Sequence, residues 1–399
     1  LGISWERKSK FGFVWWMMEI KTLGELCNIA SGGTPSRSKS EYWNEGTIPW
    51  IKIGNIKGKY VNEADEFITQ EGLKSSSAKI FSKGTVLYTI FATLGEVGIL
   101  NIEACTNQAI AGITIKNIYQ LDTDYLYYYL KSKKKFVNNV GRGVAQSNIN
   151  MSILKSFEIP LPNFVVQKKV VNVLDIVSSI IENYQQEIQT LDELIKSRFV
   201  EMFGDPISNP MGWNKKPLAN ECDIVTGNTP SRKVPEYYGD YIEWIKSDNI
   251  NTPNAILTIA EEYLSEEGLK VGRSVDAGAI LMTCIAGSIG CIGNVAIANR
   301  TVSFNQQING IVPKRNNTWF MYVLFELSKG GIQSAINMAL KGILSKGQLA
   351  EMEFIFPPVK LQNEFGDFVE QIDKLKVVAQ EALDETQKLF NSLMQQYFG

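Results

Sequence analysis

The side chains best suited to chemistry in this chain are arginines that follow a repeated turn motif. The motif Gly-x-Thr-Pro-Ser-Arg occurs twice and ends at Arg37 and at Arg232. A proline-centred turn can present a guanidinium to a phosphate or to the edge of a base. A salt bridge within the loop would use the same charge, so a nucleic-acid contact and a structural ion pair both remain open as interpretations.

A second repeated pair consists of amide side chains, at Asn107-Gln108 and at Asn305-Gln306. An amide can hydrogen-bond to adenine through two atoms at once, which makes these residues candidates for reading a base. Buried amides that brace a loop explain the same pattern equally well.

Basic residues are also concentrated in one stretch, because no acid lies between Asp124 and Glu158 while six lysines and arginines do. Lysines and the backbone N–H groups of glycine-rich loops can hold phosphates, although a solvated helix end is the competing interpretation. The candidate DNA-binding residues over the whole chain are Arg37, Lys39, Lys52, Lys79, Lys133, Lys134, Arg142, Arg232, Lys233, Lys246, Arg273, Lys341 and Lys346.

Catalytic signatures are absent from the sequence. The 399 residues include no histidine, which excludes Ser-His-Asp and Cys-His catalysis and histidine-ligated zinc. There is no Walker phosphate loop, GxGxxG fingerprint or HExxH helix. The five cysteines form no CxxC pair, and Cys27 and Cys222 occupy matching apolar positions typical of buried thiols. We therefore predict no catalytic residue, metal site or cofactor in this chain.

Composition indicates a soluble globular protein. Hydrophobic residues make up 44% and charged residues 21% of the chain, and its length suits two or three domains. The formal net charge of −2 does not exclude a local basic face. No apolar run is long enough for a membrane span, so a cytoplasmic protein is expected. Residues 1–17 are predicted to be a leader or an extension, with Met17 or Met18 as a plausible natural start.

The elements that must position the candidate residues occur twice, about 195 positions apart. Residues 23–31 (LGELCNIAS) match 218–226 (LANECDIVT), and 84–89 (GTVLYT) match 278–283 (GAILMT). The latter pair has the apolar, glycine-bounded pattern of buried strands. Frequent turn signals and irregular connections predict an α+β fold with mixed, partly antiparallel sheets in two duplicated globular domains.

Each copy ends in a long helix, in residues 162–204 and 357–399, with apolar residues alternately three and four positions apart. This heptad pattern predicts that the two helices form an antiparallel coiled coil, each about thirty-three residues and roughly 50 Å long. The alternative is two amphipathic helices that each lie on their own domain. The predicted helix-pair interface consists of Val170, Val173, Val177, Ile180, Tyr184, Leu191, Phe365, Phe368, Ile372, Leu375, Ala379 and Leu389.

The predicted boundaries follow from these elements. After residues 1–17 come a first globular domain (18–158), a central long helix (159–204), a second globular domain (205–353) and a C-terminal long helix (354–399).

These motifs together resemble the specificity subunit of type I restriction–modification enzymes. The resemblance rests on Gly-x-Thr-Pro-Ser, a following Glu-Tyr-aromatic triplet, Trp-Ile, the Asn-Gln pair, and proline five residues before a glutamine where each long helix begins. These proline–glutamine pairs are Pro162 with Gln167 and Pro357 with Gln362. The resemblance extends over residues 18–399, and its specificity lies in the repeated order of all the motifs.

The resemblance implies two target-recognition domains that each read one half of a split sequence in double-stranded DNA. It implies pseudo-two-fold symmetry and helices that set the spacing and dock two methyltransferase subunits, which bring S-adenosylmethionine chemistry. An ATP-dependent restriction subunit, a motor and nuclease, would complete the complex, and this chain would be non-catalytic. The isolated chain could form a homodimer. The alternatives are an unrecognised enzyme, and a two-lobed protein- or saccharide-binding scaffold without DNA specificity.

Overall fold

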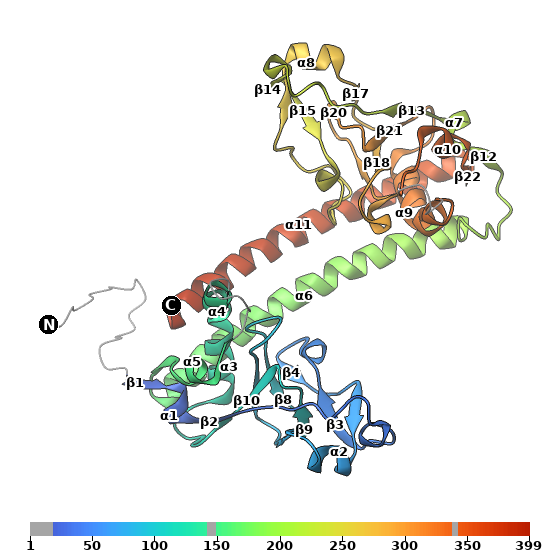
Figure 1. Ribbon diagram of the computed structural model, residues 1–399. Helices are drawn as coiled ribbons and strands as arrows, with labels where there is room; N and C mark the ends of the chain where they lie inside the picture. Colours follow the sequence, from blue (N-terminus) through green and yellow to red (C-terminus); the bar gives the residue numbers. More distant parts are fainter. Residues whose placement is uncertain (1–18, 142–148, 337–341) are drawn as a thin grey trace. The chain divides into compact units, whose positions relative to one another are not determined.

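The computed structural model describes residues 19–141, 149–336 and 342–399 (Figure 1). The predicted leader, Arg142 and Lys341 lie outside these residues. The chain forms two compact units. The first unit comprises residues up to Glu182 together with Asp384–Gly399, and the second comprises Asn183–Leu383. Each unit therefore contains one globular part and portions of both long helices.

The first globular part consists of short strands and helices that end in the first long helix, α6. Its strands are β1 Glu19–Thr22, β2 Cys27–Ser31, β3 Ile48–Ile51, β4 Tyr60–Val61, β5 Glu66–Ile68, β6 Ile80–Phe81, β7 Val86–Thr89, β8 Val97–Leu100, β9 Ala104–Thr106, β10 Ile110–Ile115 and β11 Glu158–Leu161. Its helices are α1 Leu23–Leu26, α2 Gln70–Lys74, α3 Thr123–Ser132, α4 Lys134–Gly141, α5 Met151–Lys155 and α6 Phe164–Phe203.

The second globular part repeats this order of elements and ends in the second long helix, α11. Its strands are β12 Lys215–Pro217, β13 Cys222–Thr226, β14 Tyr238–Gly239, β15 Ile242–Ile245, β16 Tyr263–Leu264, β17 Ser274–Val275, β18 Ile280–Thr283, β19 Val295–Ile297, β20 Val302–Phe304, β21 Ile308–Pro313 and β22 Glu353–Ile355. Its helices are α7 Leu218–Glu221, α8 Glu266–Val271, α9 Thr318–Ser334, α10 Lys346–Glu351 and α11 Val359–Phe398.

The sheets of the two units share one topology. The central sheet has the order β2-β10-β7-β8-β4 in the first unit and β13-β21-β18-β19 in the second. A smaller sheet has the order β5-β3-β9-β6 in the first unit and β14-β16-β15-β20-β17 in the second. A two-stranded ribbon pairs β1 with β11 in the first unit and β12 with β22 in the second. Most pairs are antiparallel, but β3 with β9, β4 with β8 and β15 with β20 are parallel. The α+β fold, its mixed sheets and its duplication are thus confirmed.

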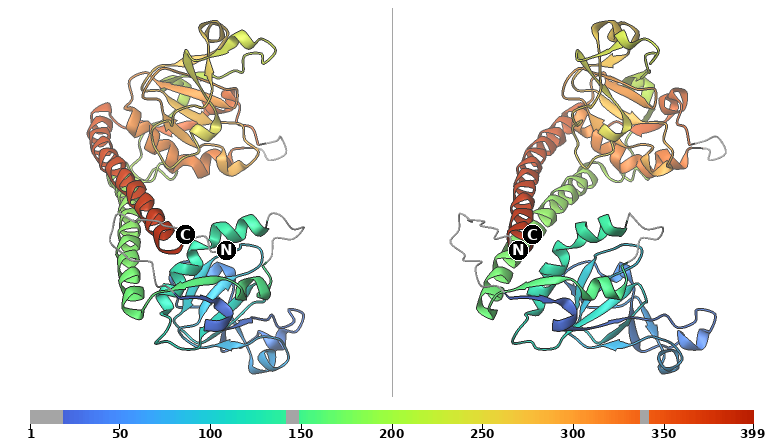
Figure 2. Two further views of the ribbon diagram at one scale, coloured as in Figure 1. Left: turned by 90° about the vertical axis from the view of Figure 1, so that its left-hand side faces the viewer. Right: turned by 60° about the vertical axis from the view of Figure 1, so that its left-hand side comes forward.

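Continuous apolar strands build the core of each unit. All four residues of β7 and of β18 are buried, as expected for strands covered on both faces. Helix α3 contacts β7 and β8 in the first unit, and α9 contacts β19 in the second. In each unit the globular part lies to one side of the long helices (Figure 2). None of the helices within the described ranges is long and apolar enough to cross a membrane.

The long helices have 40 residues each, which is longer than expected. In the second unit they pack antiparallel: Asp192 of α6 pairs with Lys376 of α11, and further along α6 the Phe199 ring lies 5.4 Å from the ring of Phe365. In the first unit the last turns of α11 pack on α3, where the ring of Phe398 lies 5.1 Å from that of Tyr125.

The residues predicted for the helix-pair interface differ in burial. Val170, Val177, Phe365, Ile372 and Ala379 are buried, whereas Tyr184, Leu191 and Phe368 are half-buried. The remaining four residues are exposed, namely Val173 (37%), Ile180 (37%), Leu375 (56%) and Leu389 (51%).

The difference lies in which face of the helix is buried and not in its period. Along α6 the buried positions include Val170, Leu174, Val177 and Ile181, which alternate in steps of four and three like the predicted seam but contain Leu174 and Ile181 in place of Val173 and Ile180. Asp175 of α6 pairs with Lys59 of the globular part, and Asp192 of α6 pairs with Lys376 of α11. Contact between the helices and contact of each helix with a globular part therefore occur together.

A buried glutamine joins each long helix to its globular part. Gln167 is 0% exposed; its side-chain oxygen accepts from the backbone N–H of Asp122 at 2.9 Å, and its nitrogen donates to the carbonyls of Gln120 and Pro162. Gln362, also 0% exposed, accepts from the N–H of Asn317 at 3.0 Å and donates to Asn316 and Pro357. Both amides are fully used, and we call each arrangement the glutamine joint.

The glutamine joint of the second unit can be tested with Gln362→Ala. Because the substitution leaves buried donors and acceptors without partners, each at a cost of about 1–3 kcal/mol, the second unit should unfold at a markedly lower denaturant concentration. The control is Gln371→Ala on the exposed surface of the same helix. Equal midpoints for the two variants in chemical denaturation would contradict a structural role for the joint.

Candidate nucleic-acid interface

The repeated motifs meet at one end of each central sheet. In the first unit β2 ends at Ser31 and β7 ends at Thr89, and both are paired with the beginning of β10. The loops 32–38, 90–96 and 107–109 therefore lie together, and we call them the loop end. In the second unit the same pairing of β13 and β18 with β21 brings together 227–233, 284–294 and 305–307.

Glycine is required where the motif leaves the sheet. A Cβ atom on Gly32 would lie 2.1 Å from Oγ1 of Thr106, and one on Gly227 would lie 2.1 Å from the carbonyl oxygen of Asn305. No side chain fits at these distances, which accounts for glycine at the first motif position in both copies. The second position differs, because Asn228 has room for its side chain and donates to the carbonyl of Val271 at 2.7 Å.

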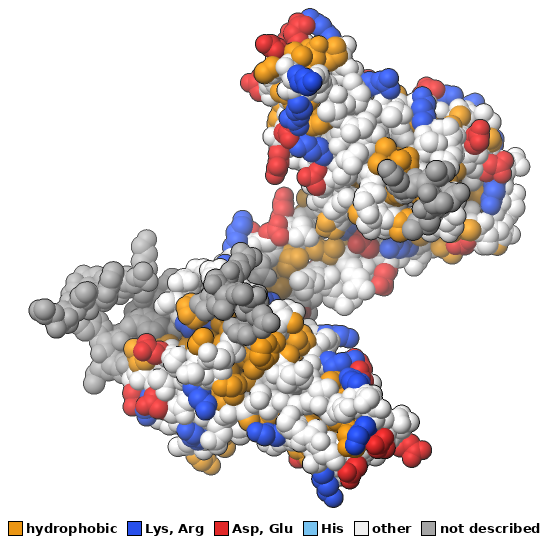
Figure 3. All heavy atoms as spheres, in the orientation of Figure 1, with side chains coloured by type: hydrophobic (Ala, Val, Ile, Leu, Met, Phe, Trp, Pro, Cys, Tyr) orange, Lys and Arg blue, Asp and Glu red, His pale blue; other side chains and the backbone are white. Residues whose placement is uncertain are grey.

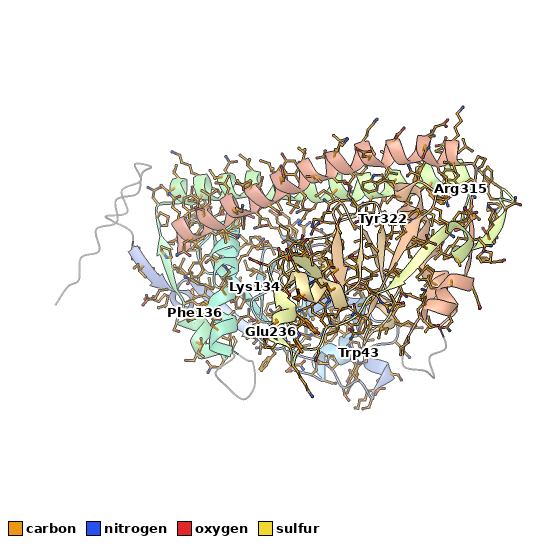
Figure 4. The ribbon with its side chains drawn as sticks, turned by 90° about the horizontal axis from the view of Figure 1, so that it is seen from above. Trp43, Lys134, Phe136, Glu236, Arg315 and Tyr322 are labelled. Atoms are coloured by element: carbon orange, nitrogen blue, oxygen red, sulfur yellow. The ribbon has the colours of Figure 1, made fainter. Side chains whose placement is uncertain are left out.

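The arginine of the first motif lies in a compact cluster of aromatic and charged side chains. The Arg37 guanidinium stacks 3.6 Å from the centroid of Trp43 and 4.9 Å from that of Trp50. Its Nη1 lies 2.5 Å from one oxygen of Glu66, and the other oxygen accepts from Lys52 at 2.7 Å. Trp43 lies on the side of the first unit away from the long helices (Figure 4).

The second motif forms the same cluster with partly different residues. Arg232 stacks 4.2 Å from the centroid of Tyr238 and 5.2 Å from that of Trp244. It donates to Glu262, whose other oxygen accepts from Lys246. Two independent copies of one arrangement make this cluster, which we call the arginine cluster, the strongest candidate for a functional site.

The glutamates of the two arginine clusters were missed in the sequence analysis. Glu66 lies in the segment DEFI and Glu262 in the segment EEYL, and these two segments occupy matching positions in the two copies. This repeated acidic residue is the sequence signal that could have identified them. Hydrogen bonds from lysine and then from arginine hold the pKa of each carboxyl below its ordinary value of 4.5. Both arginine side chains remain more than half exposed, at 53% and 55%.

The repeated amides divide the two roles that the sequence left open. Asn107 and Asn305 brace the turn, because their side-chain oxygens accept from the backbone N–H two residues further on at 3.0 and 2.9 Å. Gln108 and Gln306 are exposed, and each accepts a hydrogen bond from the motif threonine, Thr34 or Thr229. The glutamines, rather than the asparagines, are available at the loop end.

The other candidate basic residues have varied surroundings. Lys134 pairs with Glu96 at 2.6 Å, and Arg273 donates to the carbonyl of Thr226 at 2.9 Å, so both hold loop-end segments. Lys133 lies elsewhere: it donates to the last carbonyl of α11, Phe398, at 3.1 Å. Burial lowers the pKa of Lys133. Lys39 donates to Tyr42 at 2.9 Å, and exposed positions are occupied by Lys79, Lys233 and Lys346.

Charge is mixed over the visible surface of both units, where blue and red side chains alternate (Figure 3). Two hollows occur in the second unit. One, of about 220 Å³, adjoins the arginine cluster at Trp244, Lys246 and Glu262. The other, of about 330 Å³, lies between α9 and the long helices and is lined by Trp319 and Tyr322, the latter labelled in Figure 4.

Two free cysteines, the buried Cys284 and the half-buried Cys291, belong to the loop end of the second unit. Within the described ranges, no group of three or more His, Cys, Asp or Glu side chains could hold a metal ion. Cys27 and Cys222 are buried free thiols, as predicted, and burial raises the pKa of both to about 12.

One solved structure with a similar fold is a specificity subunit. The S subunit of a type I restriction–modification system from M. genitalium matches with a TM-score of 0.60 and 15% identity, and the match covers 96% of each chain. At this identity the likeness concerns the fold alone.

Sequence comparison then assigns the family. The model of the type I restriction modification DNA specificity domain matches residues 17–193 and again 210–385, so the chain belongs to this family. It is 32% identical over 241 residues to the MjaIX specificity subunit of Methanocaldococcus jannaschii, a match that covers 55% of this chain and 54% of that relative. It is 22% identical to the EcoprrI specificity subunit of Escherichia coli over 90% of this chain and 88% of that one.

The ion pairs of the arginine cluster predict a pH dependence that Glu262→Gln should remove. Because the pKa of Glu262 is lowered on folding, the stability that its carboxylate contributes is present above pH 4.5 and is lost as the pH falls through the lowered pKa. The melting temperature of Glu262→Gln should therefore fall less between pH 6 and pH 3 than that of the unmodified chain. Glu261→Gln is the matched control, and a slope for Glu262→Gln equal to that of the unmodified chain would refute the prediction.

Proposed function

We propose that this chain is the DNA-reading specificity subunit of a type I restriction–modification complex, with each unit reading one half of a bipartite target. The observation that carries the proposal is the repeated arginine cluster at the loop end of two units that belong to a DNA specificity family. Recognition of a DNA base is the expected role of such a cluster, since arginine is the residue that most often binds guanine bidentately.

The ion pair in the arginine cluster is weak enough for the arginine to exchange its glutamate partner for DNA. A half-exposed ion pair is worth about 0–1 kcal/mol, so a phosphate or guanine can replace the glutamate at little cost. Stacking on the aromatic ring fixes the plane of the guanidinium both before and after this exchange. Glu66 and Glu262 thus hold Arg37 and Arg232 in place before DNA binds. Gln108 and Gln306 supply amides beside them, which suit adenine.

The long helices support the docking of partners. Exposed apolar residues on them include Val173, Ile176, Leu375, Val377 and Val378, each between 37% and 63% exposed. Apolar side chains gathered on a helix surface are typical of protein interfaces. We infer that two methyltransferase subunits bind there and bring S-adenosylmethionine chemistry, and that restriction subunits add the ATP-dependent motor and nuclease. The complex acts on DNA in the cytoplasm, and isolated chains can use the same surface to form homodimers.

Arg232→Ala should weaken recognition of one half of the target. Loss of a bidentate base contact costs about 1–3 kcal/mol, so discrimination at that half should fall about 5- to 150-fold while the other half is still read. The measurement is DNA binding by the chain with its methyltransferase subunits, using duplexes altered in one half at a time. Lys314→Ala, which removes a cation at the opposite end of the same sheet, is the control. Unchanged discrimination at both halves would refute the assignment of Arg232.

Exchange of residues 205–350 for those of another family member should change only one half of the methylated sequence. The exchanged segment contains the second loop end and leaves both long helices in place. Sequencing that maps methylated adenines before and after the exchange is the measurement. An unaltered target, or a change in both halves, would contradict one reading site per unit.

A further inference from the structure

The loop end of the first unit exposes a large aromatic side chain beside a strained residue. Phe91 is 41% exposed, although the residues around it, Ile90 and Leu94, are each 3% exposed. The next residue, Ala92, has a φ of 61°, in the left-handed region that residues with a Cβ rarely adopt. An exposed ring and a strained backbone both oppose folding, and strain of this kind is concentrated at functional sites.

Hydrogen bonds hold the strained loop in one conformation. The buried Thr89 bridges the loop: its hydroxyl donates to the carbonyl of Thr93 and accepts from the backbone N–H of Glu96. Next to Phe91, the N–H of Ile90 donates to the carbonyl of Ala109 at 2.8 Å. The loop is thereby fixed to the segment that carries Gln108.

The second unit exposes an apolar side chain at its own loop end, from a different segment. The residue that corresponds to Phe91 is Ile285, which likewise lies two positions beyond the end of its strand and is half-buried. Ile343 is 40% exposed instead, and Gly342 before it has a φ of 58°. Ile343 is bridged to Ile285, and the next residue, the buried Leu344, donates to the carbonyl of Cys284 at 2.9 Å.

We propose that Phe91 and Ile343 are base-contacting residues that determine specificity, one in each half of the target. This inference rests on the proposed function and adds apolar contacts to the arginine cluster. Phenylalanine and isoleucine are used as wedges between base steps, a phenyl ring can stack on a base, and an aliphatic chain can pack against the methyl group of thymine. The two units present these side chains from different loops, so their half-sites should differ.

The contrast with other exposed apolar residues supports this assignment. Tyr119 is 83% exposed, more than Phe91, but it follows β10 at the opposite end of the sheet. No residue of positive φ lies next to it within the described ranges. Exposed apolar side chains that are scattered singly are ordinary. Phe91 and Ile343 combine exposure with a fixed, left-handed turn and a position among the candidate reading loops.

The test uses the full chain assembled with its methyltransferase subunits and the target mapped by methylation. Phe91→Ala should lower the preference for the cognate duplex by about 10-fold or more at the half read by the first unit, with no change at the other half. Ile343→Ala should have the mirror-image effect, so each variant is a control for the other. Phe91→Tyr, which keeps the ring, and Tyr119→Ala should both behave like the unmodified chain.

A second measurement reports base contact directly. 2-Aminopurine placed in the half read by the first unit should change its fluorescence on binding, and Phe91→Ala should abolish that change while leaving a probe in the other half unaffected. Melting temperatures equal to that of the unmodified chain confirm that the variants fold. Ile343→Val is a milder variant and should lose less discrimination at its half-site than Ile343→Ala. This inference is overturned if the unmodified chain is sequence-specific and both Phe91→Ala and Ile343→Ala discriminate between cognate and altered duplexes as well as the unmodified chain. A lack of sequence preference in the unmodified complex would instead overturn the proposed function.

Discussion

The glutamine joint is the constraint on which the arrangement of each unit depends. An amide at the start of the long helix uses all its hydrogen-bonding capacity on the N-terminal turn of α3 or α9 and on the proline before the helix. Because a misplaced amide would leave several buried groups unsatisfied, the direction in which the helix leaves the globular part is narrowly determined. The central sheet packs on α3 or α9, so the loop end is held on the same rigid body as the beginning of the helix.

The two copies keep the elements that support the loop end and vary the side chains that it presents. Gly32 and Gly227 are identical because the backbone passes too close to its neighbour for any Cβ. The aromatic partner of the arginine changes from Trp43 to Tyr238, and the exposed apolar residue comes from different loops. A scaffold defined by backbone contacts and buried amides tolerates such changes because they lie outside the core.

Much of this architecture could be predicted from sequence, since duplication and apolar runs are local properties. The buried strands around Val86 and Ile280 and both long helices were identified in this way. The buried face of the helices could not be predicted, because two adjacent faces of one helix have the same spacing and share Val170 and Val177, and only the tertiary contacts decide between Val173 and Leu174. The partner of Arg37 is Glu66, 29 positions away, and that contact depends on the pairing of β3 with β5.

The two units differ most where the long helix meets the globular part. In the first, the Lys59 ammonium lies between Asp124 and Asp175, at 2.9 and 2.5 Å, and ties the loop before β4 to both α3 and α6. In the second, the residue at the same backbone position is Ala255, which lines a hollow of about 330 Å³ instead. There the helices are held by buried phenylalanines, with the rings of Phe199 and Phe320 stacked at 5.6 Å. Aromatic packing at the junction is common to both units, because the ring of Phe398 lies 5.1 Å from that of Tyr125 in the first and the ring of Phe203 lies 5.0 Å from that of Phe320 in the second. The Lys59 clamp has no counterpart at Ala255, so the common geometry of the units comes from the glutamine joint, this aromatic packing and the topology of the sheets.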